Sequence, residues 1–539
     1  MSNSLGSSST SQAQRFFRTP ELLDIVTSML SRRDRIRVLS VSHTLFDSAA
    51  PTIWRRLWRT SDLLLLISHS RLVKVSESTE LVEFPCPLTK NHLKRLNVYG
   101  RFVRELTIGD EEQQRSPYPF HSRNSSIRSD SVLNWEALAG CFSDCPLLPN
   151  LVEIALWNPD HHVCLKWLQV LLYPSVRRVS MGSRWPVEAA CEFLGLVGRR
   201  SVPLEYLSVV VDDSEADHAV AGPVHNTSWQ NQSKMGLSLD SLRHIRSLDL
   251  GAASLCPGGL VTLSRHPYLQ ELSVSAERTP RTDNILFGPA PFPSMRKIFL
   301  NNVPCGFWLI GFCSLAPLFK NLEAVYIAIQ PDWMLKPGFD SRSGDSFLQR
   351  LCETSPKITN LVVLFAGKDD NAPVITISQA GEAALRKLQL ESLVLDSARL
   401  EGGCEFLSSA WPGIVRLRCN RQQASIEHLA CFARNLPRLQ RLVLDLDWTG
   451  SSIPSYDPGS PISPQNPAFT ALCMVPLRRV DRFASVSKRL AECVPLLIQI
   501  VDKPDWIQTD ICIFCGQTYI VHGHGGTTFI GAPKLTATR

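Results

Sequence analysis

The feature that most constrains the fold of this 539-residue chain is a short unit that recurs from about residue 100 onward. Each copy holds an apolar residue, two polar residues and then an alternating apolar stretch. The first apolar residues of successive copies, from Leu151 to Leu439, are 25, 28, 41, 24, 26, 27, 36, 32, 24 and 25 residues apart. A period near 25 with occasional insertions indicates a solenoid of repeats, whereas the strands of an ordinary βαβ enzyme domain would not share this spacing. The copies lie at 101–109, 149–158, 174–182, 202–211, 243–252, 267–276, 293–302, 320–329, 356–365, 388–397, 412–420 and 437–446.

Each copy predicts a short strand, because its side chains alternate between apolar and polar. Helix-like segments lie between the strands, at 164–172, 189–197, 306–318, 347–354, 380–388 and 426–435. One copy cannot bury its own apolar face, so stacked copies would form a parallel sheet inside and a layer of helices outside. This pattern is similar to the leucine-rich repeat, in a degenerate form, because the Asn or Cys expected after the strand is mostly missing. The predicted fold class is therefore α/β, with an irregular leucine-rich-repeat solenoid.

Composition divides the chain into five expected parts. Residues 1–18 are mostly small and polar, which predicts a disordered tail, with a transit peptide as the competing interpretation. We expect a small helical domain over 19–60, a helical linker over 61–100, the repeats with loop insertions over 101–500, and a strand and tail over 501–539. Segments 110–131, 212–236, 278–292, 336–347 and 450–468 read as the insertions, and 478–502 as a terminal helix and strand.

Charge, cysteine content and hydropathy narrow the class of protein. Residues 1–60 hold nine Arg and four acidic residues, so most of the net charge of +6 lies in the first tenth of the chain, and the rest shows no broad basic stripe. We therefore expect no nucleic-acid partner. The longest aliphatic run, Leu63 to Ile67, is far shorter than a membrane span of ~20 residues, and no secretory signal is recognisable. Sixteen scattered cysteines favour reduced thiols in the cytoplasm, the nucleus or both.

Residues 19–59 predict three short helices. Thr19 can cap the first, Pro20 suits its first position, and Ser31 or Asp34 can cap the second. Pro51 is expected to open the third. Apolar residues at three- and four-residue spacing make one stripe on the first helix: Leu22, Leu23, Val26, Met29 and Leu30.

The segment from Thr19 to Trp58 resembles an F-box, especially the form that opens many fungal F-box proteins with degenerate leucine-rich repeats. The F-box pattern falls here on Pro20, Leu22, Leu23, Ile25, Leu30, Leu39, Val41, Ser42, Phe46, Trp54 and Leu57. Two departures are Thr19, where Leu is usual, and Arg35-Ile36, where a Leu pair is more common. The resemblance covers about 40 residues, and the repeats behind it cover most of the rest.

That resemblance implies the substrate-recognition subunit of an SCF-type cullin–RING ubiquitin ligase. Such a protein docks on a Skp-type adaptor, and through it on a cullin, while its repeats bind a target protein. It is not an enzyme, because it supplies proximity alone. The residues expected to contact the adaptor are Pro20, Leu22, Leu23, Ile25, Leu30, Val41 and Trp54. The same side chains could instead form the core of the helical domain, and an unrelated repeat scaffold is the alternative function.

On the inner face of the repeats, the exposed position of each strand would contact the partner. The candidates are Glu153, Arg178, Glu205, Glu271, Lys297, Glu323 and Arg416, with Ser247, Glu391 and Gln440 at related positions. Their charges alternate in sign, so they favour no single class of ligand, and most of them could simply be solvated.

The sequence gives only weak signals for metal binding or catalysis. Cys512-x-x-Cys515 with His522 and His524 has a zinc-like composition, but the His spacing is shorter than usual, so we expect no metal and no cofactor. No G-x-S-x-G or H-E-x-x-H motif is present, and the paired acids at 111–112 and 369–370 lie in loop-like segments.

Overall fold

The structure is a computed structural model. It divides the chain into two compact units, Met1–Leu269 and Gln270–Arg539, and each is described by itself. The residues that the structure describes are 19–58, 60–76, 79–109, 132–142, 146–157, 160–212, 238–251, 255, 257–275, 287, 291–304, 306–313, 315–330, 341–365, 374–446 and 471–475.

The first unit begins with three helices: α2 (Pro20–Met29), α3 (Arg32–Val38) and α4 (His43–Trp54). Both α2 and α3 pack against α4. The third helix was predicted to open at Pro51, which is wrong: α4 begins eight residues earlier, where the Ser42 hydroxyl accepts a hydrogen bond from the Leu45 N–H at 3.2 Å. Pro51 lies inside α4, close enough to its end that only a few residues continue the helix beyond it.

The segment 61–100 was predicted to be a helical linker, but only its ends are helical, as α5 (Thr60–Leu64) and α6 (Lys94–Gly100). Between them, β2 (Arg71–Ser76) and β3 (Thr79–Glu83) form an antiparallel hairpin. The hairpin is tied to the repeats, because the Asn134 side chain bonds both the N–H and the carbonyl of Phe84, at 3.1 and 2.9 Å.

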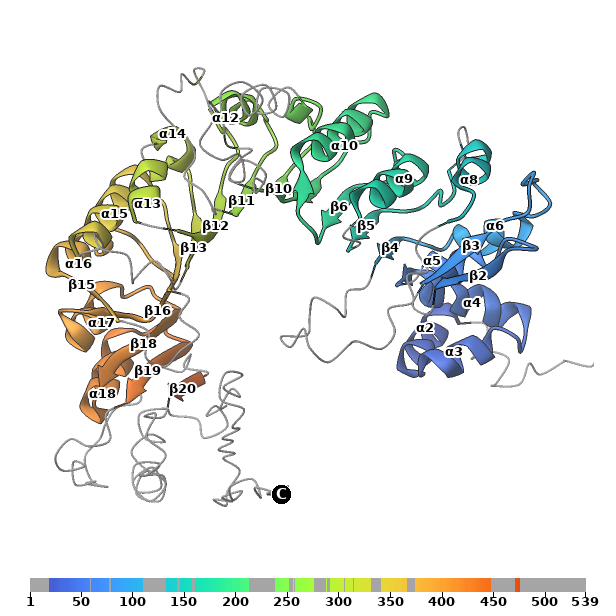
Figure 1. The fold of residues 1–539 in the computed structure, drawn as a ribbon. Coiled ribbons are helices and arrows are strands. Elements are labelled where there is room, and N and C mark those ends of the chain that lie inside the picture. Colours follow the sequence, from blue (N-terminus) through green and yellow to red (C-terminus); the bar gives the residue numbers. More distant parts are fainter. Residues whose placement is uncertain are drawn as a thin grey trace, which may run out of the picture. The chain divides into compact units, whose positions relative to one another are not determined.

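The repeats of the first unit form a parallel sheet in which each strand lies beside the strand of the next repeat (Figure 1). Neighbours along the sheet are β1 (Arg56–Leu57), β4 (Glu105–Ile108), β5 (Glu153–Leu156), β6 (Arg178–Met181), β8 (Tyr206–Val209) and β10 (Ser247–Gly251). The return segments contain α8 (Trp135–Cys141), α9 (His161–Leu171), α10 (Val187–Arg199), α12 (Pro257–Ser264) and a small parallel pair, β7 (Trp185–Pro186) with β9 (Val211–Asp212).

The second unit repeats the arrangement with longer strands. Its parallel sheet runs in the order β11 (Glu271–Ser275), β12 (Lys297–Val303), β13 (Ala324–Ile329), β14 (Asn360–Phe365), β16 (Ser392–Asp396), β18 (Arg416–Ala424), β19 (Arg441–Leu446) and β20 (Ala471–Val475). A second small pair is formed by β15 (Ile375–Ile377) and β17 (Ala398–Leu400). The helices are α13 (Gly306–Cys313), α14 (Ala316–Phe319), α15 (Ser341–Thr354), α16 (Gln379–Leu385), α17 (Gly403–Ala410) and α18 (Ile426–Asn435).

The predicted fold class is confirmed, since every copy of the repeat contains a strand of a parallel sheet and helices lie in the return segments. In the second unit the described helices lie on one face of the strands, so the other is here called the helix-free face (Figure 1). On the strands whose side chains the structure describes, alternate apolar residues are buried, as Ile298 and Leu300 are on β12 at 1 and 0% exposure. Burying one Leu contributes about 1.5–3 kcal/mol, so these rows stabilise the stack.

Several predicted segments lie outside the described residues. They are the tail 1–18, most of the loop insertions, the terminal helix and strand at 478–502, and the part 501–539. The boundaries between the predicted parts stay predictions.

Candidate functional site

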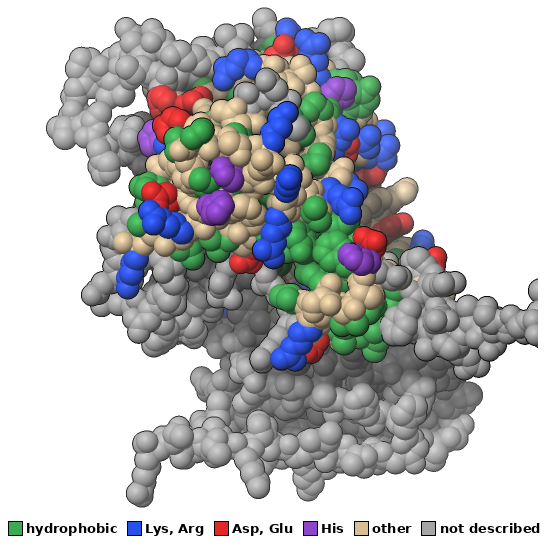
Figure 2. Space-filling model, turned by 90° about the vertical axis from the view of Figure 1, so that its right-hand side faces the viewer, with side chains coloured by type: hydrophobic (Ala, Val, Ile, Leu, Met, Phe, Trp, Pro, Cys, Tyr) green, Lys and Arg blue, Asp and Glu red, His purple; other side chains and the backbone are tan. Residues whose placement is uncertain are grey.

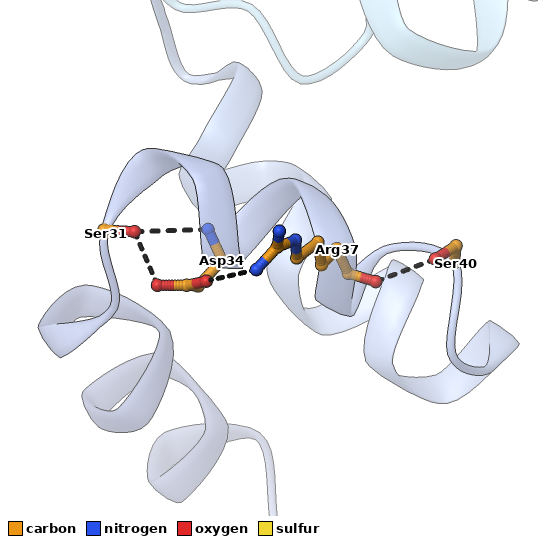
Figure 3. A network of polar contacts seen from close by, with 4 residues as sticks. All are labelled: Ser31, Asp34, Arg37 and Ser40. Carbon is orange, nitrogen blue, oxygen red and sulfur yellow. Dashed lines mark hydrogen bonds and ion pairs between the residues drawn. The ribbon is translucent and has the colours of Figure 1, made fainter.

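The three N-terminal helices are held in place by short polar contacts. Pro20 occupies the first turn of α2, as predicted, while Thr19 precedes the helix without a side-chain capping bond, contrary to the prediction. At α3 the Ser31 hydroxyl accepts a hydrogen bond from the Asp34 N–H at 3.3 Å and donates one to the Asp34 carboxylate at 2.6 Å (Figure 3). Asp34 also pairs with Arg37 at 3.3 Å. These contacts cap the start of α3.

The inward face of α2 is small and well buried. Leu23 is 2% exposed and Thr27 is 1% exposed, and α2 packs on α4, where Ala49 and Ala50 are fully buried. Leu23 was predicted to contact an adaptor. Its burial assigns it instead to the core of the helical domain, which is the alternative that the sequence left open.

The outward face of α2 is apolar and exposed. Leu22, Ile25, Val26 and Met29 follow one another at helical spacing and are 41, 57, 38 and 80% exposed. We call these four residues the α2 stripe. Contiguous exposed apolar residues on a small domain are typical of an interaction site, because monomeric proteins rarely expose a large apolar patch to water.

Two further exposed apolar residues belong to neighbouring parts of the helical domain. Ile36 lies on α3 with 51% exposure, and Val41 lies between α3 and α4 with 68% exposure. Of the predicted adaptor contacts, Leu22, Ile25 and Val41 are therefore accessible, and Leu30 is half-buried. Val26, Met29 and Ile36 were not among the predicted contacts, although the spacing of Val26 and Met29 on the predicted stripe was a sufficient signal.

Trp54, also predicted to contact the adaptor, packs within the chain. Its ring lies 4.6 Å from that of Tyr99 on α6, and Phe46 lies 5.6 Å from the same ring. These aromatic residues join α4 of the helical domain to α6, which precedes the first repeat. Part of the aromatic surface of the half-buried Trp54 thus packs within the chain, and its contact with an adaptor stays a prediction.

The candidate residues on the strands form a row across each sheet. Arg178 is in register with Glu153 and pairs with it at 3.4 Å, and Lys297 is in register with Glu271 and pairs with it at 2.6 Å. Opposite charges on neighbouring strands stabilise the sheet modestly, by about 0.2–1 kcal/mol per pair. Most of the predicted charges in this row therefore satisfy one another.

Glu205 and Glu323 were predicted to lie in that row. The strand register shows that each of them lies one residue before it. The carbonyl of Glu205 accepts hydrogen bonds from the N–H groups of Arg246 and Ser247, at 2.8 and 3.0 Å, which places it just ahead of the strand. Tyr206 and Ala324 occupy the row instead. Glu323 makes the equivalent backbone contacts, and its side chain pairs with Arg296 at 2.9 Å.

The helix-free face of the second unit carries an apolar strip that sequence analysis missed. The residues in register across four neighbouring strands are Phe299, Tyr326, Val362 and Val394, all half-buried. Leu364 lies beside them on β14 and is also half-buried. These five residues are called the inner strip. The signal was present in the sequence, because the polar alternation of the repeats is lost at these positions.

The inner strip ends at charged residues on β16 and β18. Arg418 continues the register after Val394 and makes two hydrogen bonds with the Asp396 carboxylate, both at 3.0 Å. Beside it, Arg416 and Arg441 are exposed and in register with each other. Of these, Arg416 was a predicted partner-binding residue.

Several cysteines of the described residues are buried thiols that form no disulfide with one another. Burial raises the pKa of Cys352 and of Cys404 to about 12, so both thiols stay protonated near neutral pH. Within the described part of the chain, no group of three or more His, Cys, Asp or Glu could hold a metal ion. The zinc-like set Cys512, Cys515, His522 and His524 lies outside that part.

The described residues on the face shown in Figure 2 carry side chains of both charges. On the face in Figure 2, Lys and Arg side chains are interspersed with Asp and Glu. Among the described helices, none combines the length and the apolarity that crossing a bilayer requires.

Comparisons with known proteins give distant structural likenesses only. No protein-family model matches the chain. No curated protein matches it either. Three solved structures resemble it: a yeast complex of Rad7 and Elc1 (12% identity, TM-score 0.35, 83% of this chain and 94% of the other), a TLR13–ssRNA13 complex (17%, 0.30, 61% and 45%) and an internalin, InlF, from Listeria monocytogenes (13%, 0.27, 57% and 87%). Likenesses at this level do not identify a family.

Proposed function

We propose that the chain is the substrate-recognition subunit of an SCF-type ubiquitin ligase, in the cytoplasm, the nucleus or both. The α2 stripe would dock in an apolar groove of a Skp-type adaptor, which would connect the chain to a cullin. The repeats would hold a target protein, and the chain itself would make and break no bonds. The observation that carries this proposal is the exposed apolar stripe on a three-helix domain whose sequence resembles an F-box.

The chemistry of the α2 stripe fits such a groove. Met29 and Ile25 project unbranched and branched apolar side chains at 80 and 57% exposure, and burying each would contribute about 1.5–3 kcal/mol. Leu23 and Thr27 hold the opposite face of the helix against α4, so the stripe is presented by a supported helix.

Co-purification with a Skp-type adaptor tests this proposal. The full chain is expressed with the adaptor, and binding is measured for the wild type and for Ile25→Glu and Met29→Glu. Each charge would be buried in the groove without a partner, so affinity should fall by at least about tenfold. Val374→Glu is the matched control, because Val374 is 43% exposed and lies in the other unit.

The alternative function is a repeat scaffold unconnected with ubiquitination, in which the helical domain only caps the repeats. The contact of Trp54 with Tyr99 favours a capping role, because it joins α4 to α6, which leads directly into the first repeat. If this were the whole function, no Skp-type adaptor would bind the folded wild-type chain, and Ile25→Glu would leave every interaction of the chain unchanged.

A further inference from the structure

The segment 84–104, which contains α6, has a local excess of positive charge. It holds five Lys or Arg residues and no Asp or Glu. The nearest acidic residues on either side are already paired, Glu83 with Arg71 and Glu105 with Arg56. The five cations are all exposed: Lys90, Lys94, Arg95, Arg101 and Arg104.

Helix α6 presents part of this charge around an exposed apolar residue. Leu96 is fully buried on the inner side of the helix, where α6 packs against α4 and α5. Successive residues of an α-helix are about 100° apart, so Lys94 and Arg101 share one direction, and Arg95 lies on the far side of Val98. Val98 is 43% exposed. We call these four exposed residues the α6 basic face: Lys94, Arg95, Val98 and Arg101.

The cations of the α6 basic face form no ion pair with a carboxylate of the described residues. Exposed cations on the strands do find such a partner, as Arg178 does in Glu153. The guanidinium of Arg101 lies over the Phe102 ring, 4.6 Å from its centroid. Stacking of this kind fixes the guanidinium plane and leaves its edge able to donate two parallel hydrogen bonds to a carboxylate. The α6 basic face is therefore complementary to acidic side chains.

The surroundings of α6 fit an acidic peptide better than a nucleic acid or a bilayer. Single-stranded nucleic acid stacks its bases on aromatic planes, whereas Tyr99 contacts Trp54 and Phe102 lies under Arg101. A helix that lies in a bilayer surface buries a row of large apolar side chains, whereas the one exposed apolar residue of α6 is Val98.

We propose that the α6 basic face binds an acidic peptide segment of a partner protein, with an apolar residue of that segment against Val98. This inference goes beyond the proposed function, because the face shares no residue with the α2 stripe. Lys94 and Arg101 are seven residues apart, a rise of ~10 Å along the helix. At ~3.3 Å per extended residue, the two acidic residues that meet them stand about three positions apart in the peptide, with the apolar residue between them.

Selection from a random dodecapeptide library on phage against the full-length chain tests this inference. We expect enrichment of peptides with two Asp or Glu residues about three positions apart, on either side of a large apolar residue. A fluorescent synthetic copy of the most enriched peptide is then titrated. Its affinity should fall at least about tenfold in K94E/R101E, because attraction becomes repulsion. K94Q/R101Q, which adds no negative charge near the end of α6, should weaken binding at least about threefold, and Val98→Ser at least about twofold.

R243E/R246E is the matched control, because Arg243 and Arg246 are exposed in the same unit and the net charge changes by the same amount. All variants should keep the melting temperature of the wild type within a few degrees. Four results would overturn the inference: no enrichment of acidic peptides, an enriched peptide that binds K94E/R101E as tightly as the wild type, an equal loss of affinity in R243E/R246E, or tighter binding of a twelve-residue oligo-dT or of phosphatidylserine vesicles than of any peptide. Adaptor binding by K94E/R101E should equal that of the wild type, so failure of this inference and failure of the proposed function are distinguishable.

Discussion

Trp54 and Tyr99 lie with their ring centroids 4.6 Å apart and their planes tilted by 40°, joining α4 of the helical domain to α6. Phe46 approaches the same tyrosine at 5.6 Å, edge to face. The helical domain is therefore packed against α6 through two aromatic residues of α4.

Replacing Trp54 by Ala should therefore destabilise the first unit without removing the α2 stripe. The loss of a half-buried indole and of its aromatic partner should cost about 1–3 kcal/mol in the free energy of unfolding. Urea denaturation followed by circular dichroism measures this cost. Unchanged stability would show that the junction is not formed, and adaptor affinity below the transition should equal that of the wild type.

Gly182 should tolerate no side chain, because a Cβ there would lie 1.8 Å from Cε3 of Trp157. The Gly182 N–H also bonds the Leu156 carbonyl at 2.7 Å, so the backbone cannot easily withdraw. Gly182→Ala should cost about 1–3 kcal/mol by overpacking. Gly258→Ala, where a Cβ would meet no heavy atom within 4 Å, is the control and should change the unfolding free energy by much less.

His266 should make stability depend on pH. The residue is 5% exposed, and its Nε2 has no hydrogen-bond partner within the described structure. Burial lowers the pKa of His266 from 6.5, and the nearby carboxylate of Asp240 offsets only part of that. The unfolded chain therefore binds the proton more readily, so the contribution of His266 is complete above about pH 6.5 and is lost as the pH falls through the lowered value. Unfolding free energies from pH 7.5 to 5 should fall more steeply for the wild type than for His266→Phe; equal slopes would contradict this.

The Arg418–Asp396 pair should contribute modestly to stability. Its geometry is bidentate, but the side chains are 41 and 21% exposed, so solvent screens much of the attraction. A double-mutant cycle with Arg418→Ala and Asp396→Ala should give a coupling of about 0.5–1 kcal/mol. A coupling near zero would mean that the pair is not formed in solution.

Much of the repeat architecture was predictable because two local signals agreed. The alternation of apolar residues fixed the strands, and the period near 25 fixed their order, so the strands of all copies lie where they were expected. The one-residue error at Glu205 and Glu323 arose because each carbonyl accepts two N–H groups from the next repeat, so pairing begins one residue later than the alternation indicates. The hairpin of β2 and β3 was missed although its segment is rich in Val, because helices were expected between the domains.

The candidate adaptor site could be predicted only in part. The apolar spacing grouped Leu22 and Leu23 in one stripe. Adjacent side chains on a helix point about 100° apart, however, and the packing of α2 on α4 buries Leu23 and leaves Leu22 exposed. Trp54 fitted the F-box pattern, but no local signal shows that its ring meets Tyr99, which is 45 residues away in the sequence. Contacts between segments far apart in the sequence therefore determine the surroundings of both Leu23 and Trp54.

The most direct measurement is the affinity of the purified full-length chain for a Skp-type adaptor, with Ile25→Glu beside it. We predict a stable complex for the wild type and a loss of affinity of at least about tenfold for the variant, with the affinity of Val374→Glu unchanged. A folded wild-type chain that fails to bind the adaptor, or an Ile25→Glu chain that binds as tightly as the wild type, would contradict it.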